Sequence, residues 1–85
     1  MMASAMREFL LPIMSAVAEF TAVVKPQSAF YERYGSHGIA LLEDIFKHAK
    51  SLGIPIILDA KRGDGGPTAE AYADTYLGTV PYWDR

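Results

Sequence analysis

The sequence of 85 residues contains no cysteine, which excludes disulfide bonds and thiolate metal sites. It also has no basic block: eight lysines and arginines are scattered along the chain and the formal net charge is -2, so nucleic-acid binding is not indicated. Near the N-terminus, one brief apolar run ends at Pro12, too short to span a bilayer and unlike a signal peptide. We therefore expect a cytoplasmic protein without nucleic-acid or membrane partners.

Apolar residues are plentiful and make up 51% of a chain that is long enough for one domain at most. Their helical spacing predicts helices over residues 6–19, 36–51 and 67–77, with Pro12 as a kink or a late start and Gly53 as a stop signal after the second helix. Two short apolar segments, 21–24 and 54–58, predict strands. We expect the first strand to end at Lys25, because the residue before a proline is driven to extended geometry.

Strands that alternate with helices predict an α/β fold, in which helices cover a parallel sheet. Chemistry in such folds gathers at the carboxyl ends of the strands, where this chain has Lys25 and then Asp59 with Lys61. Alternation along an extended chain points residues 59 and 61 the same way and Ala60 the opposite way. We interpret the three charges as a preorganised electrostatic site.

A structural alternative is open at this point, because charges at strand ends are often only solvated. In that interpretation Lys61 and Asp64 form an ordinary turn pair, which contributes about 0 to 1 kcal/mol. We interpret Glu32 and Arg33, which lie between the two strands, as solvated charges.

Two motifs, DAKRGD at residues 59–64 and VKPQSAFYERYG at residues 24–35, closely resemble the bacterial branch of orotidine 5'-phosphate decarboxylase. The resemblance implies part of a (β/α)8 TIM barrel, in which a helix, strand, helix, strand and helix follow the missing first strand. It also implies removal of CO2 from orotidine 5'-phosphate to give UMP, a step of pyrimidine biosynthesis, with no metal or organic cofactor.

The resemblance assigns roles by position. Lys25 is similar to the lysine that contacts the ribose and the first carboxylate of the charged network. Asp59 resembles the aspartate set against the substrate carboxylate, and Lys61 the lysine that protonates C6 as CO2 leaves. Asp64 resembles the aspartate that crosses a homodimer interface into the partner's site, and Thr68 the hydroxyl that accompanies it.

The length differs from that of the family, because a complete barrel takes about 250 residues. We expect residues 1–85 to be a single partial barrel segment of about a third of that length, with a divergent tail at 79–85, and to be inactive in isolation. Two alternatives stay open. One is a magnesium-dependent sugar-phosphate decarboxylase or synthase of the same superfamily, and the other is a non-catalytic fragment that associates with itself.

Overall fold

The computed structural model describes residues 2–78, most of which are helical. The elements are α1 (Met2–Val17), a 3-10 helix η1 (Ala18–Phe20), α2 (Ala29–Glu32), α3 (Gly35–Ser51) and α4 (Gly66–Leu77). The three expected helices are confirmed, although α1 begins at Met2 rather than Met6 and runs through Pro12 without interruption. The short helix α2 was not predicted, and the expected tail at 79–85 lies outside the described residues. Within the described range no helix is long and apolar enough to cross a membrane.

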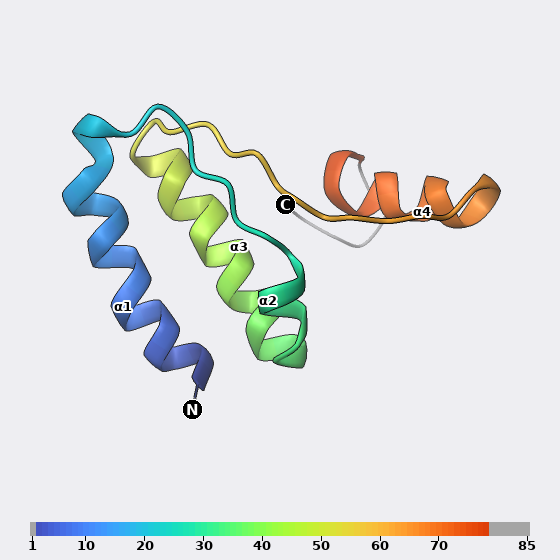
Figure 1. Cartoon of the computed structure of the whole chain (residues 1–85), viewed down its shortest axis with the longest axis horizontal. Helices are drawn as coiled ribbons and strands as arrows, with labels where there is room; N and C mark the ends of the chain where they lie inside the picture. The colour runs from blue at the N-terminus through green and yellow to red at the C-terminus, as the bar shows by residue number, and fades with distance from the viewer. Residues whose placement is uncertain (1, 79–85) are drawn as a thin grey trace.

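The two segments predicted as strands lie side by side and run parallel, as the cyan and yellow stretches of Figure 1 show. They are joined at two bridges in one register, Val24 with Ile56 and Gln27 with Asp59. Four backbone hydrogen bonds connect them: Val24 N–H to Pro55 O, Ile57 N–H to Val24 O, Asp59 N–H to Pro26 O and Ser28 N–H to Asp59 O.

Pro26 explains why these bonds form two separate bridges and no continuous ladder. In this register the next bond of a parallel pair would run from the N–H of residue 26 to the carbonyl of Ile57. Proline has no N–H, so that bond is missing while the Pro26 carbonyl still accepts from Asp59. The prediction of two full strands, with the first ending at Lys25, is therefore wrong: pairing continues to Ser28 but is interrupted at Pro26.

Helices α1 and α3 pack against each other and against these two segments (Figure 1). The buried core consists of Met14 from α1, Leu41, Ile45 and Ala49 from α3, and Ile54 at the start of the second segment. Val24 and Ile56, which pair across the two segments, pack on this core. The arrangement is one parallel pair connected through α2 and α3, and its helices bury one face of the pair.

The C-terminus of α3 turns the chain into the second segment. Gly53 has φ 71°, a left-handed conformation that glycine adopts without steric cost. Its N–H donates to the Lys50 carbonyl and the N–H of Ile54 donates to the Ala49 carbonyl, which together form a Schellman cap. The stop signal predicted at Gly53 is confirmed, and it directs Ile54 into the core.

Candidate active site

The acidic and basic side chains predicted to share one face of the second segment are in direct contact. Lys61 Nζ donates to both carboxylate oxygens of Asp59, at 2.7 Å to Oδ1 and 2.5 Å to Oδ2. The Asp59 side chain is 20% exposed and the Lys61 side chain 75% exposed, so the carboxylate is partly enclosed while the ammonium faces outward. The prediction that the two charges lie side by side is confirmed.

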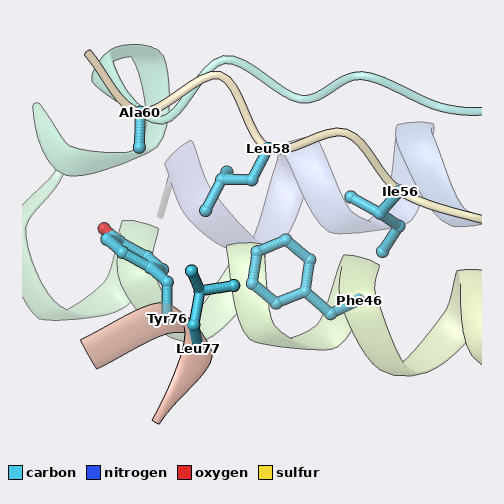
Figure 2. A pocket seen from close by; sticks show the side chains of 6 residues that line it. All are labelled: Phe46, Ile56, Leu58, Ala60, Tyr76 and Leu77. Carbon is cyan, nitrogen blue, oxygen red and sulfur yellow. The ribbon is translucent and has the colours of Figure 1, made fainter. Parts of the chain in front are cut away.

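The opposite face of the same segment is apolar, as alternation requires. Ile56, Leu58 and Ala60 point toward Phe46 of α3 and toward the end of α4 (Figure 2). With Tyr76 and Leu77 they line a hollow of about 530 Å³. The segment therefore anchors one face among helices and presents Asp59 and Lys61 on the other.

The carboxyl group of Asp59 is held in its charged form. The hydrogen bond from Lys61 lowers its pKa, partial burial acts in the opposite direction, and the positive charges of Lys61 and Lys25 lower the pKa further. Lys25 thus acts on Asp59 from the neighbouring segment, although the Lys61 ammonium makes the direct contact. Of the three charges expected at the carboxyl ends of the segments, Asp59 and Lys61 are in direct contact and Lys25 acts through its charge alone.

The remaining two predicted site residues lie farther along the chain and are exposed. Asp64 precedes α4 by two residues, and Thr68 is in the first turn of that helix. Between them Gly66 has φ 58°, a backbone conformation that favours glycine. Asp64 and Thr68 therefore lie at the turn into α4, and within residues 2–78 no hydrogen bond or ion pair joins either of them to Asp59 or Lys61.

A second ion pair lies directly beside the first and was missed at the level of sequence. Arg62 Nη2 contacts Glu32 Oε1 at 2.8 Å, and Glu32 Oε2 accepts a hydrogen bond of 2.5 Å from Ser28 Oγ. Ser28 is fully buried. The interpretation of Glu32 as a solvated charge is therefore wrong, whereas Arg33 is exposed. The signal that could have identified Glu32 is its spacing of four residues from Ser28, which places both on one side of a helical turn.

Across residues 2–78, no three side chains of histidine, aspartate or glutamate gather in a way that could hold a metal ion. What the site offers instead is a carboxylate kept ionised, an outward-facing ammonium beside it and a second ammonium within electrostatic range. Fixed charges of this kind can stabilise charge that develops in a transition state.

A parallel pair with a helical crossover and charged side chains at its carboxyl end is found in βα-barrel enzymes and in doubly wound α/β enzymes. Comparison with known proteins makes the assignment specific. Residues 4–80 match the model of the orotidine 5'-phosphate decarboxylase / HUMPS family, and the chain belongs to that family.

Individual relatives agree with this assignment. Over 69 residues the chain is 52% identical to an orotidine 5'-phosphate decarboxylase of Nocardioides sp., covering 81% of this chain and 25% of the relative. Over 72 residues it is 46% identical to the Streptomyces coelicolor enzyme of the same description, covering 85% of this chain and 26% of the relative. A solved structure from Streptomyces avermitilis, provisionally assigned as an orotidine 5'-phosphate decarboxylase, matches with a TM-score of 0.80 and 44% identity over 88% of this chain and 26% of that one.

The chain therefore spans about a quarter of the length of the relatives that it matches. The solved structure that the chain resembles belongs to a family with a TIM-barrel fold.

Proposed function

We propose that this chain supplies the charged centre of an orotidine 5'-phosphate decarboxylase, a cytoplasmic enzyme that releases CO2 from orotidine 5'-phosphate and forms UMP. The observation that carries the proposal is the Asp59–Lys61 pair at the carboxyl end of two parallel segments, with Lys25 close enough to lower the pKa of Asp59. Relatives that are 52% and 46% identical to it over 69 and 72 aligned residues are described as orotidine 5'-phosphate decarboxylases.

In the proposed reaction the bond between C6 and the carboxylate carbon breaks, CO2 leaves and the electron pair stays on C6. The Lys61 ammonium, which donates hydrogen bonds to the Asp59 carboxylate, gives a proton from Nζ to C6 and is then reprotonated by water. Asp59 accepts hydrogen bonds from the Lys61 ammonium on both carboxylate oxygens and faces the departing carboxylate. Lys25 contacts the ribose and adds positive charge to the network. None of these steps uses a metal or an organic cofactor.

Asp64 and Thr68 act in this proposal on a second copy of the chain. Both are exposed at the turn into α4, where they are accessible to a partner. In the dimer, Asp64 contacts the lysine and the substrate ribose in the partner's active site, and Thr68 lies at the same interface. The active enzyme is then a homodimer with sites that both subunits complete.

A graft into a full-length relative tests the proposal. The 69-residue region of the Nocardioides sp. enzyme that aligns with this chain is replaced by the residues of this chain, and loss of orotidine 5'-phosphate absorbance is followed. We expect the graft to turn over substrate and Lys61→Ala to lower its kcat by about 1,000-fold or more, while affinity for UMP changes much less. Lys47→Ala, on the exposed side of α3, is the matched control and should leave kcat unchanged.

Three results would contradict the proposal. A folded graft without activity would mean that these residues cannot supply the charged centre. A loss below tenfold in Lys61→Ala would reduce Lys61 to a structural charge. Activity of the graft that disappears with a chelator and returns with magnesium would favour a metal-dependent sugar-phosphate enzyme of the same superfamily.

A further inference from the structure

Arg62, the residue after Lys61, is held on several sides by groups that the proposed chemistry does not use. Its guanidinium pairs with Glu32 at 2.8 Å, contacts the Tyr76 hydroxyl at 3.5 Å and lies 4.9 Å from the centre of the Tyr72 ring. These partners come from α2 and α4. An arginine fixed by an ion pair and an aromatic face has few alternative orientations.

The Arg62 guanidinium also contacts the backbone of the second extended segment, which carries Asp59 and Lys61 and which we call the active-site segment. Arg62 Nη1 donates to the carbonyl of Lys61 at 2.9 Å. The carbonyl of Asp59 accepts from the N–H of Ser28 at 3.0 Å, and the hydroxyl of Ser28 donates to Glu32. The carbonyls of both members of the charged pair are therefore fixed from one connected set of groups, which we call the Glu32 clamp: Ser28, Glu32 and Arg62.

We propose that the Glu32 clamp is a positioning device for the Asp59–Lys61 pair: it fixes the backbone at both residues so that the lysine ammonium stays on the carboxylate. The effect of the clamp on turnover rests on the proposed function. Its effect on the contact between Asp59 and Lys61 does not, and can be measured in this chain alone. Glu32 and Arg62 are positioning residues, because their contacts with the pair run through the backbone.

The physical need for such a device follows from exposure. The Lys61 side chain is 75% exposed and has four rotatable bonds, so its ammonium has many orientations available if the backbone moves. Ser28 has no exposed surface and anchors the clamp in the interior. Through Tyr72 and Tyr76 the clamp also reaches α4, whose first turn carries Thr68 and is preceded by Asp64. The residues proposed for the dimer interface are thereby tied to the residues proposed for proton transfer.

The decisive experiment measures the titration of the Asp59 carboxyl by NMR in the full 85-residue chain and in Glu32→Gln. Removal of a nearby negative charge by itself lowers the pKa of a carboxyl group. Loss of positioning raises it, because the hydrogen bond from Lys61 is the largest cause of the lowered value. The two effects have opposite signs, and we expect Glu32→Gln to raise the pKa of Asp59.

Controls separate positioning from general damage. Glu70→Gln removes the same charge from an exposed position on α4 and should not raise the pKa of Asp59. Arg62→Lys keeps the charge but cannot hold Glu32 and the Lys61 carbonyl together, so it should also raise the pKa. All samples are compared where chemical shifts of core residues show the native fold. An unchanged or lower pKa in Glu32→Gln would overturn the proposal.

The graft enzyme gives a second readout that stands apart from the first. There we expect Glu32→Gln to lower kcat by about 10-fold to 100-fold while KM changes little, because misplacement affects the reacting geometry more than ground-state binding. An inactive parent graft together with a raised Asp59 pKa would reject the function and keep the clamp. An active graft that is insensitive to Glu32→Gln, with no pKa change, would reject the clamp alone.

Discussion

At the scale of single residues, Gly38 decides how closely α2 can approach α3. A Cβ atom at this position would lie 1.8 Å from the Tyr31 carbonyl oxygen and 2.8 Å from the carbonyl carbon, both of which are backbone atoms. Such atoms cannot move aside as the end of a flexible side chain can. Since α2 carries Glu32, the close approach that Gly38 allows holds this member of the Glu32 clamp against α3.

We expect Gly38→Ala to destabilise the chain by about 1 to 3 kcal/mol, because the added methyl group forces a backbone shift. The sign is informative, since alanine in place of glycine inside a helix ordinarily stabilises by about 0.5 to 1 kcal/mol. The free energy of unfolding in urea is the measurement. Gly63→Ala, where an added Cβ meets nothing within 4 Å, is the control. A Gly38→Ala variant as stable as the parent would show that α2 is free to move away.

At the scale of elements, the pairing of the two extended segments determines where the charged side chains lie. The register of Val24 with Ile56 brings Gln27 opposite Asp59, which puts Lys25 within electrostatic range of the carboxylate. Pro26 removes one bond from the middle of this pair, between two bonded positions. The segments are consequently held by the bonds on both sides of Pro26 and by the side chains packed beneath them.

Pro26→Ala tests this explanation of the broken ladder. The substitution restores an N–H that faces the Ile57 carbonyl, and we expect that amide to exchange with solvent as slowly as the amides of Ile57 and Asp59. Hydrogen exchange followed by NMR is the measurement, and Pro55→Ala is the control because the Pro55 carbonyl already takes part in the pairing. Rapid exchange at residue 26 would mean that the segments separate there for a reason other than the missing donor.

At the scale of the whole molecule, the chain is open and keeps much apolar surface. Its radius of gyration is 13.9 Å, whereas a compact domain of this length has about 12 Å. Phe9 and Phe20 are 66% and 83% exposed, and with Ile13 and Val17 they follow α1 and η1 at helical spacing. In the solved relative, the matched region makes up 26% of the chain. Many more residues are therefore available in that protein to cover the apolar surface of the helix that corresponds to α1.

We expect the 85-residue chain to self-associate at micromolar concentration, because the exposed apolar side chains lose contact with water when two copies meet. Sedimentation should give a mass above the 9.3 kDa of the monomer that rises with concentration. Replacing both Phe9 and Phe20 with lysine should shift the population toward monomer, whereas Lys47→Ala should not. A monomer that unfolds cooperatively at all concentrations would contradict this expectation.

The sequence by itself determined the features that depend on local covalent geometry. Helical spacing of apolar residues located α1, α3 and α4, and Gly53 marked the end of α3. Strand alternation placed Asp59 and Lys61 on one face and Ala60 on the other, because successive side chains of an extended segment must point in opposite directions. The two motifs identified the family.

Only the tertiary structure decided the contacts between residues far apart in the chain. Glu32 and Arg62 are separated by 30 positions, and their contact depends on the path that α3 takes between the two extended segments. The continuation of pairing past Pro26 likewise depends on register, which the packing of Val24 and Ile56 on the core sets. Local propensity does not predict the contact of Glu32 with Arg62 or the register of the two extended segments. The free energy that stabilises both comes from burial shared among several elements.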